Sequence, residues 1–334
     1  MIKHEIQFTA IKTAQIVERQ LPELKADSVL VKTQYTVVSA GTERANLLDM
    51  PNTFAYGRFP KVEGYAGVGI VERTGENVKK VKIGDTVLVY HGTHADYSVV
   101  KERNVYPIPA TVDAKQAVLC IIGAMGLGGL RKTALELGES AAVFGMGLLG
   151  LFACACARIG GAYPVIAVDL DENRRALAIE MGADYALDSN ERGFAERVKE
   201  LTRGGANAIV EVTGSAKAFS QALDCAARQA RIALNGCTRV SDCSIDYYRQ
   251  IHCPGITVIG AHNGVRPATD SYPHYWTNEA DTLALVRLIE GGRLDVSPLI
   301  GEVVSTNDCA SVYKRLCDDK EFPIGVLFDW QRKK

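Results

Sequence analysis

Three glycines, Gly145, Gly147 and Gly150, lie at the junction of two apolar segments. Residues 141–144 form an apolar run with the length of a buried strand, and residues 148–159 are small and apolar over the length of a helix. In a strand–turn–helix junction of this spacing, the first glycine permits a tight turn, the second lets a ligand approach the backbone, and the third lets the helix pack against the strand. The free N–H groups at the helix start favour a bound pyrophosphate.

A second apolar run, 165–168, ends at Asp169. The offset of Asp169 from the glycines is close to the ~20 residues expected for an acid that binds the ribose hydroxyls of a dinucleotide. A carboxylate at this position would repel the additional phosphate of NADP, so we expect a preference for NAD. The alternative is that the glycines serve only a tight helix–strand contact. Because strand, helix, second strand and acid occur in the required order, the sequence predicts a dinucleotide site.

Strand and helix patterns alternate from Ser140 to about Ala261, which is typical of a parallel sheet with helices on both faces. The first 109 residues instead show short strands separated by turns, and helical spacing recurs at 113–137 and 278–290. The sequence therefore predicts an α/β protein with a doubly wound Rossmann sheet and a separate, mostly β part. Within the alternating region the expected strands are 141–144, 165–168, 184–187, 208–212, 231–235 and 256–260, and the expected helices are 148–159, 172–181, 191–202 and 215–227.

The composition is ordinary for a globular protein: 334 residues, 47% hydrophobic and 23% charged, with a net charge of −1. This balance favours neither nucleic acid nor an anionic membrane surface as a partner. No stretch reaches the ~18 uncharged apolar residues of a membrane span, and the N-terminus has no apolar signal core. We expect a cytoplasmic protein whose nine cysteines are buried or half-buried free thiols rather than disulfides or metal ligands.

Five further motifs lie along the chain: Ser39-Ala-Gly-Thr-Glu, Glu63-Gly-Tyr-Ala-Gly-Val-Gly-Ile-Val, Lys82-Ile-Gly-Asp-Thr-Val, Ala95-Asp-Tyr-Ser-Val-Val and Glu211-Val-Thr-Gly. With the glycines and Asp169 they make nearly the whole chain resemble the medium-chain dehydrogenase/reductase superfamily, the fold of zinc alcohol and polyol dehydrogenases. The resemblance implies a GroES-like, mostly β catalytic domain at 1–122 and 262–334, a Rossmann NAD-binding domain at 123–261, and an active site in the cleft between them.

The chain departs from the zinc enzymes at the metal ligands. Ala40 stands where they have a cysteine, Gly64-Tyr65-Ala66 replaces their Gly-His-Glu, and the third ligand position falls near Ile121. These side chains offer no thiolate, imidazole or carboxylate for zinc. The loop that would hold a structural zinc is also missing, because only nine residues separate Asp85 from Ala95. We therefore expect neither the catalytic nor the structural zinc ion in this protein.

Without a metal, a side chain must hydrogen-bond the substrate oxygen and move its proton. The resemblance places Tyr65, His91 and Thr42 at the vacant site as candidate catalytic residues. The phenol replaces the ligand histidine, the imidazole titrates in a useful pH range, and the threonine matches a hydroxyl that relays protons in alcohol dehydrogenases. Each could instead be structural: a packed tyrosine, a surface histidine, or a threonine bonded to backbone. We expect His94, Glu43 and Arg44 to serve local structure, the last two as a buried ion pair.

The resemblance also implies which groups hold the cofactor and the substrate, at the edge of the Rossmann sheet where its strands end. His262 and Asn263 follow the strand expected to run past the nicotinamide, and they are the candidates for substrate contact. The expected cofactor residues are Gly145, Met146, Gly147, Leu148, Leu149, Gly150, Asp169, Arg174, Thr213, Gly214, Leu234, Asn235, Gly236, Gly260 and Ala261.

The motifs resemble most a zinc-lacking branch of the superfamily, with bacteriochlorophyllide dehydrogenase-like and sugar- or polyol-dehydrogenase-like members. Ala66 departs from the Gly-Tyr-Glu form of the pigment enzymes, which favours a sugar, polyol or cyclitol derivative as substrate. Aromatic and basic residues in 262–276 suit a hydroxylated ligand, although a purely structural loop is equally compatible with them.

Three functions remain open from the sequence. The first is a zinc-independent, NAD-dependent alcohol/ketone oxidoreductase. The second is an NAD(P)H-dependent enone or quinone reductase, against which the strict glycine spacing and Asp169 argue. The third is a nucleotide-binding sensor without catalysis. We also expect a homodimer, because the last Rossmann strand, 256–260, lies at a sheet edge that can pair with its copy across a two-fold axis.

Overall fold

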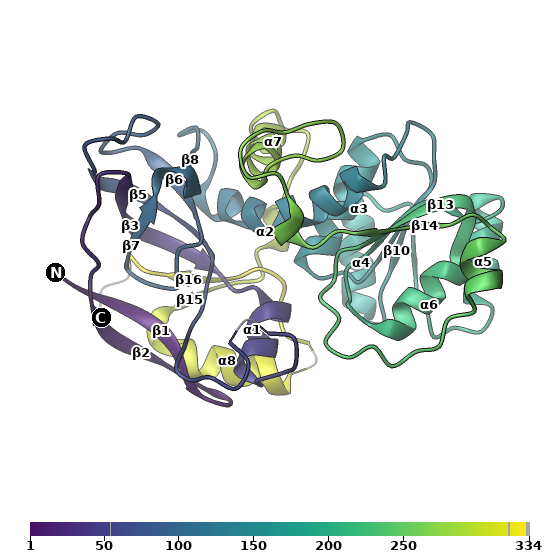
Figure 1. The fold of residues 1–334 in the computed structure, drawn as a ribbon, viewed down its shortest axis with the longest axis horizontal. Coiled ribbons are helices and arrows are strands. Elements are labelled where there is room, and N and C mark those ends of the chain that lie inside the picture. The colour runs from purple at the N-terminus through teal and green to yellow at the C-terminus, as the bar shows by residue number, and fades with distance from the viewer. Residues whose placement is uncertain (54, 320, 332–334) are drawn as a thin grey trace. The chain divides into compact units, whose positions relative to one another are not determined.

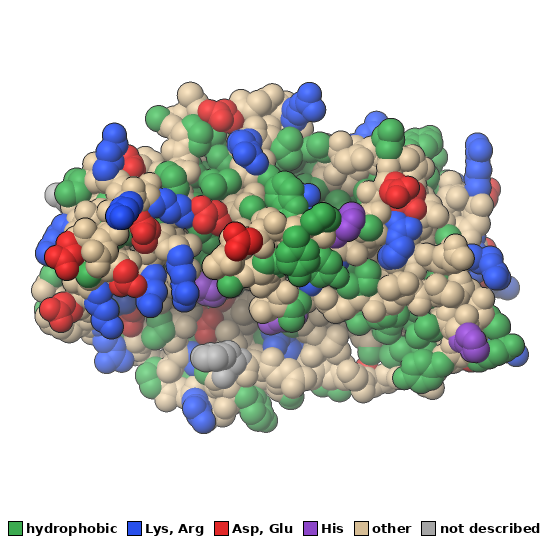
Figure 2. Space-filling model, turned by 45° about the horizontal axis from the view of Figure 1, so that its top comes forward, with side chains coloured by type: hydrophobic (Ala, Val, Ile, Leu, Met, Phe, Trp, Pro, Cys, Tyr) green, Lys and Arg blue, Asp and Glu red, His purple; other side chains and the backbone are tan. Residues whose placement is uncertain are grey.

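The computed structural model describes residues 1–53, 55–319 and 321–331 (Figure 1). The chain forms two compact units. The first comprises Met1–Ile122, Val286–Gly292 and the described residues from Val296 onward, and the second comprises Gly123–Leu285 and Arg293–Asp295. In the described part of the chain no helix is both long and apolar enough to span a membrane. On the face shown in Figure 2, Lys and Arg side chains are interspersed with Asp and Glu.

The second unit is built on a six-stranded sheet with the order β11-β10-β9-β12-β13-β14, and all its neighbouring strands are parallel. Its strands are β9 (Ala141–Phe144), β10 (Val165–Val168), β11 (Tyr185–Leu187), β12 (Ala206–Glu211), β13 (Ala226–Leu234) and β14 (Thr257–Gly260). The connecting helices are α3 (Leu148–Ile159), α4 (Glu172–Glu180), α5 (Phe194–Thr202) and α6 (Ala216–Cys225). The doubly wound sheet predicted from the alternating pattern is therefore confirmed.

Alternation of side chains along the buried strands explains why helices cover both faces of this sheet. Ala142, Phe144, Ile166 and Val168 share one face and pack in a core with residues of α5 and α6. The intervening strand residues are equally buried, and β9 and β10 contact α3 on the other face. Strands buried on both faces read as continuous apolar runs, and this made 141–144 and 165–168 recognisable in the sequence.

The first unit is mostly β and is built from both ends of the chain. A seven-stranded sheet runs β15-β16-β3-β5-β6-β8, with β7 pairing β3, and a smaller sheet has the order β2-β1-β4. The larger sheet contains β3 (Ser28–Val37), β5 (Ala66–Thr74), β6 (Thr86–Tyr90), β7 (Tyr97–Lys101), β8 (Val105–Pro107), β15 (Glu302–Ser305) and β16 (Val326–Asp329). The smaller contains β1 (Ile2–Ala10), β2 (Thr13–Gln20) and β4 (Lys61–Val62).

Two short helices, α1 (Ala40–Leu47) and α8 (Cys309–Asp318), pack in the first unit against the apolar side of β1. Neither was predicted from the sequence. The apolar face of α8 is buried against Phe8, from the other end of the chain, and against Phe328 of β16. The centroid of the Phe8 ring lies 4.8 Å from that of Tyr313 on α8, in an edge-to-face contact.

The helix boundaries predicted from the sequence agree with the structure for one helix, α7, and differ from it at one end of α2 and of α5. The helix α7 (Asn278–Glu290) matches its expected range, whereas α2 (Ala114–Lys132) ends before the predicted limit of 137, and α5 begins after the predicted 191. Gly193 precedes α5 in the left-handed region with φ of 78°, so the helix cannot extend toward 191.

All nine cysteines are free, but the expectation that all are at least half-buried is wrong for Cys237, Cys243 and Cys253, which are exposed.

The segment 262–285 clusters with the second unit, whereas the sequence assigns it to the catalytic domain. The reason is a buried ionic contact. Asp281 on α7 has no exposed surface and accepts hydrogen bonds from Arg131 of α2 (2.6 Å) and Arg266 (2.9 Å). Because a buried carboxylate without partners is costly, this contact ties the segment to the second half of α2.

Candidate functional site

The turn between β9 and α3 has the backbone that the glycine spacing predicts. Gly145 has a φ of +96°, which favours glycine. A Cβ on Gly150 would lie 1.8 Å from the Gly145 carbonyl oxygen, so only glycine lets α3 start this close to the strand. A Cβ on Gly147 would meet nothing within 4 Å. Protein packing therefore does not explain Gly147, and the open space above it fits a ligand that approaches the backbone.

Asp169, at the end of β10, turns its carboxylate toward this turn. One carboxylate oxygen accepts the Met146 N–H at 2.5 Å, and the other accepts the Asp171 N–H at 2.9 Å. The guanidinium of Arg175 donates to the Asp169 carbonyl oxygen at 2.9 Å. These contacts hold the acid next to the expected pyrophosphate position, where it can accept hydrogen bonds from ribose hydroxyls.

Two neighbouring turns at the ends of β12 and β13 are held together by Glu211, which is 2% exposed. Its carboxylate accepts the backbone N–H groups of Thr213 (2.7 Å) and Gly214 (3.2 Å), and its carbonyl accepts those of Asn235 and Gly236, each at 2.8 Å. Burial raises the pKa of Glu211. A Cβ on Gly236 would lie 2.2 Å from the Gly214 nitrogen, so the expected cofactor positions after β12 and β13 are in direct contact.

Leu170, directly after Asp169, is 60% exposed, as are several other large apolar side chains of the chain, so its exposure alone assigns it no role. Arg174, an expected cofactor residue, is half-buried, and its backbone N–H caps α4 by donating to Asp171 at 3.0 Å.

The end of β14 is held by hydrogen bonds to β13 and to α2. The Ala261 N–H donates to the Leu234 carbonyl at 2.9 Å, and the Lys132 ammonium donates to the Gly260 carbonyl at 3.1 Å. His262 is exposed, and its Nδ1 accepts the Gly264 N–H at 3.1 Å, which leaves Nε2 as the ring nitrogen for a substrate contact. Asn263 is half-buried.

In the first unit, the structure brings Tyr65 and His91 together and adds a residue that the sequence did not indicate. The Tyr65 hydroxyl lies 2.8 Å from the hydroxyl of Ser39, the residue that precedes α1. The His91 N–H donates to the Tyr65 carbonyl at 2.9 Å. Thr42 is half-buried in the first turn of α1, after Ser39. Of the three predicted catalytic residues, only Tyr65 has its side chain at this paired hydroxyl, while His91 contacts Tyr65 through the backbone.

His91 is an exposed residue with a φ of 58°, and its ring stacks on that of Tyr90 at a centroid distance of 3.8 Å. Partial burial of the ring lowers the pKa of His91, and the positive charge of Arg103 lowers it further. At neutral pH the imidazole is therefore uncharged, and it can accept a proton.

The buried partner of Glu43 is not Arg44, so the predicted ion pair is wrong. Adjacent helical residues point in different directions, and Arg44 is exposed whereas Glu43 is fully buried. The Glu43 carboxylate instead accepts hydrogen bonds from His94 Nε2 (3.2 Å), the Tyr313 hydroxyl (2.7 Å) and the Ser39 N–H (2.8 Å). Because the Ser39 hydroxyl contacts Tyr65, this buried carboxylate fixes the backbone that carries the Ser39–Tyr65 pair.

A second buried carboxylate, Glu63, lies in the same region and is 7% exposed. Burial, together with the negative charge of Glu43, raises the pKa of Glu63 from 4.5 to about 8. Asn46 donates a hydrogen bond to its carboxylate at 3.0 Å. The folded chain therefore holds Glu63 protonated at neutral pH, which avoids placing two buried negative charges side by side.

This protonation makes stability depend on pH. Between about pH 4.5 and 8 the folded chain binds a proton at Glu63 that the unfolded chain releases, so stability falls as pH rises through this window. We expect the free energy of unfolding to fall by about 3 kcal/mol between pH 5 and 8 from this group. Urea titrations of Glu63→Gln should lack this decline, while Glu76→Gln, at an exposed position, should retain it. An equal decline in Glu63→Gln would contradict the assignment.

The residues at the zinc positions of the superfamily do not fit a zinc ion. Ala40 begins α1, and Ile121 on α2 is fully buried. Tyr65 presents a phenol that is bonded to Ser39, and neutral phenol, methyl and alkyl groups are poor ligands for zinc. Across the described ranges there is no group of three or more His, Cys, Asp or Glu side chains placed to hold a metal.

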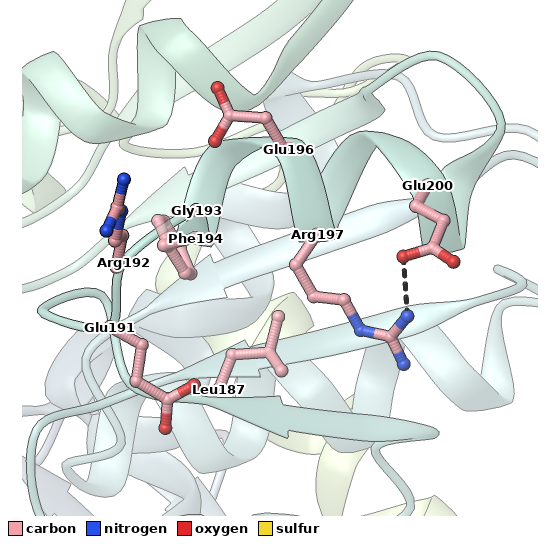
Figure 3. Close-up of a pocket in the computed structure, with 8 residues that line it drawn as sticks. All are labelled: Leu187, Glu191, Arg192, Gly193, Phe194, Glu196, Arg197 and Glu200. Carbon is pink, nitrogen blue, oxygen red and sulfur yellow. Dashed lines mark hydrogen bonds and ion pairs between the residues drawn. The ribbon is translucent and has the colours of Figure 1, made fainter.

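A cavity of about 580 Å³ lies in the second unit beside α5. Figure 3 shows the side chains that line it, including the ion pair of Arg197 and Glu200 at 2.6 Å. Its lining is a mixture of acids and arginines around Leu187 and Phe194, and none of the expected cofactor residues contributes to it. We therefore do not assign the cofactor to this cavity.

Two protein-family models match parts of this chain. Residues 25–110 match the alcohol dehydrogenase GroES-like domain, and residues 149–279 match the zinc-binding dehydrogenase family. L-threonine 3-dehydrogenase of Pyrococcus furiosus is 29% identical over 322 residues, which cover 86% of this chain and 87% of that protein.

Solved structures show the same fold. Galactitol-1-phosphate dehydrogenase from Escherichia coli superimposes with a TM-score of 0.84 at 22% identity, over 98% of this chain and 99% of that one. A protein from Sinorhizobium meliloti bound to NADP has a TM-score of 0.83 at 21% identity, with 98% and 99% covered. On the two domain matches, the relatives and the fold, the chain belongs to the zinc-type alcohol dehydrogenase-like branch of the medium-chain dehydrogenase/reductase superfamily.

Proposed function

We propose that this protein is a zinc-independent, NAD-dependent oxidoreductase that interconverts a secondary alcohol and a ketone. The observation that carries the proposal is the Tyr65–Ser39 hydroxyl pair, 2.8 Å apart, at the position where zinc enzymes of the superfamily have a ligand histidine. A paired phenol can donate a hydrogen bond to a substrate oxygen and exchange a proton with it, which replaces the Lewis-acid role of a metal.

The cofactor supplies hydride transfer when bound. Gly147 leaves room for its pyrophosphate, and α3 contributes N–H groups and the positive end of its dipole. Asp169 would accept hydrogen bonds from the ribose and repel an additional phosphate, which supports NAD rather than NADP. In this proposal Tyr65 and Ser39 hold the substrate oxygen. We assign the proton acceptor to His91, because its lowered pKa leaves the imidazole uncharged at neutral pH and its backbone N–H donates to the Tyr65 carbonyl.

The substrate class that we propose is a sugar, polyol or cyclitol derivative. Exposed polar and aromatic groups after β14 support it: His262 is exposed, and Tyr272 is 55% exposed with its ring stacked on Tyr275 at a centroid distance of 5.2 Å. Aromatic faces and imidazole donors suit hydroxylated ligands. Part of the predicted loop has a different role, because Arg266 is bonded to Asp281, and Trp276 lies 3.7 Å from the Arg131 guanidinium.

The test is a cofactor titration on protein of measured metal content, followed by assays with a panel of sugars and polyols. We expect NADH to bind at least tenfold more tightly than NADPH, no stoichiometric zinc, and turnover that persists with a chelator. Stoichiometric zinc would overturn the metal-free mechanism, and a preference for NADPH would overturn the role of Asp169. Turnover of enones or quinones alone would identify a reductase of activated double bonds. Binding without any turnover would identify a nucleotide sensor.

We also infer that the protein is a homodimer that pairs through β14. This strand is at the open edge of the Rossmann sheet, and Val258 at its centre is 37% exposed. Unpaired edge strands with apolar side chains favour pairing with a copy. Analytical ultracentrifugation at micromolar concentration should give a dimer, and Val258→Lys should give a monomer that still binds NADH. A monomeric wild-type protein would contradict the inference.

A further inference from the structure

A buried imidazole, that of His94, lies between the two segments that carry the Ser39–Tyr65 hydroxyl pair. Neither His94 nor Glu43 has exposed surface. The His94 Nε2 lies 3.2 Å from each carboxylate oxygen of Glu43, and its Nδ1 lies 2.7 Å from the Thr36 hydroxyl. Both ring nitrogens of this histidine therefore have a partner in the interior of the first unit.

The partners of His94 determine the direction of its hydrogen bonds. The indole N–H of Trp330 can only donate, and it donates to the Thr36 hydroxyl oxygen at 3.0 Å. The single hydrogen of that hydroxyl is then available for Nδ1 of His94. A carboxylate only accepts, so Nε2 carries a hydrogen and donates it to Glu43. The imidazole thus orients the carboxylate by contacting both of its oxygens.

Through this carboxylate, His94 acts on the Ser39 side of the pair. The Glu43 oxygen that accepts the backbone N–H of Ser39 at 2.8 Å is one of the two that His94 contacts. The other oxygen accepts the Tyr313 hydroxyl at 2.7 Å. Because donors on both sides hold Glu43, the residue that precedes α1 is held as well.

His94 also contacts the backbone on the Tyr65 side of the pair. Its N–H donates to the Glu63 carbonyl at 2.8 Å. Gly64 has a φ of +88°, and a Cβ there would lie 2.8 Å from Cγ and Cδ2 of the His94 ring. The imidazole therefore packs directly on the peptide backbone that precedes Tyr65.

We propose that His94 is a positioning residue, which acts through Glu43 and through the backbone at 63–64 to hold the two hydroxyls of the Ser39–Tyr65 pair together. This inference rests on the proposed function. In that function the phenol must meet the substrate oxygen in a fixed orientation, and a displacement of about 1 Å can cost 100-fold in rate. His94 is thus required for the geometry of the site without contact to substrate or cofactor.

The first experiment compares His94→Asn with His94→Gln. A glutamine amide nitrogen can take the place of Nε2 and still donate to Glu43, whereas the shorter asparagine reaches only the position of Nδ1. Both variants lose the edge-to-face contact with the Phe328 ring, whose centroid is 5.3 Å away. The two variants therefore share the loss of packing and differ in the hydrogen bond to the carboxylate.

We expect His94→Asn to lower kcat by about 10- to 100-fold with an unchanged NADH dissociation constant, and His94→Gln to stay within about threefold of wild-type kcat. In a Ser39→Ala background, His94→Asn should lower kcat by less than about twofold more, since the pair is already lost. Equal losses in the two His94 variants, or losses that multiply in the double variant, would show that the ring only packs and would overturn the inference.

A measurement that needs no turnover follows the Tyr65 ring in protein labelled with [ζ-¹³C]tyrosine, with its NMR signal assigned by Tyr65→Phe. Ser39→Ala and His94→Asn should move the Tyr65 signal in the same direction. His94→Gln should leave it in place, as should His252→Asn, which replaces an exposed histidine of the second unit. An unmoved signal in His94→Asn would overturn the inference.

If His94→Asn does not fold, because Glu43 is left as a buried charge with one donor fewer, the double variant His94→Asn/Glu43→Gln removes that charge. It should move the Tyr65 signal as Ser39→Ala does, and an unmoved signal would again overturn the inference. Absence of turnover with every substrate of the panel, together with a moved signal, would overturn the proposed function alone and support the role of His94 in holding the pair.

Discussion

Gly147→Ala should abolish most NADH binding while leaving the protein folded. A Cβ at this position meets no atom within 4 Å, and the residue has a φ of −76°, which alanine adopts readily. We therefore expect the free energy of unfolding to change by less than about 1 kcal/mol, mainly through the weaker N-cap. The methyl group would occupy the space assigned to the pyrophosphate, and such overpacking should weaken NADH binding by about 10- to 100-fold.

Gly150→Ala is the matched comparison, because it should lower both the stability of the protein and its affinity for NADH. Its Cβ would lie 1.8 Å from the Gly145 carbonyl oxygen, so α3 or the turn must shift, at a cost of roughly 1–3 kcal/mol in stability. Urea unfolding of the two variants measures the loss of stability that comes from packing, and NADH fluorescence titration measures the loss of binding that comes from blocking the space for the ligand. Wild-type NADH affinity in Gly147→Ala would show that no pyrophosphate passes over this residue, and the dinucleotide assignment would fail.

Tyr65→Phe should lower kcat by about 100- to 10,000-fold, which is the range for loss of a positioned acid or base. The variant keeps the aromatic ring and its edge-to-face contact with Tyr90, at a centroid distance of 6.4 Å, and it removes only the hydroxyl bonded to Ser39. Stability should therefore fall by no more than about 1 kcal/mol. The NADH dissociation constant should be unchanged, since the residues assigned to the cofactor are in the second unit.

The measurement is steady-state turnover of the best substrate from the sugar and polyol panel, across pH, with NADH affinity determined in parallel. Tyr97→Phe, at another half-buried tyrosine of the first unit, is the control and should keep wild-type kcat. Full activity of Tyr65→Phe would remove the phenol from the mechanism. If His91→Ala lost activity while Tyr65→Phe kept it, proton transfer would be assigned to the imidazole instead.

Several features of this protein were determined by short stretches of sequence. The segments 141–144, 148–159 and 165–168 match β9, α3 and β10 residue for residue. Each has a local cause: strands buried on both faces are continuous apolar runs, and glycines delimit the turn between strand and helix. The parallel sheet and the glycine turn follow from these patterns, because strands and helices that alternate along the chain form a parallel sheet with helices on its faces.

Other features were decided only by the tertiary structure. Two of the partners of Glu43 come from positions 94 and 313, and those of Asp281 include positions 131 and 266. Hydrogen bonds between residues so far apart leave no period or spacing in the sequence, so Glu43 was paired with its neighbour Arg44, and Ser39 was not connected to Tyr65. For the same reason α8 was not predicted, since its apolar face becomes buried only when both chain ends meet. The local sequence thus determined the glycine turn after β9, whereas long-range packing decided which side chains surround Tyr65 and Asp281.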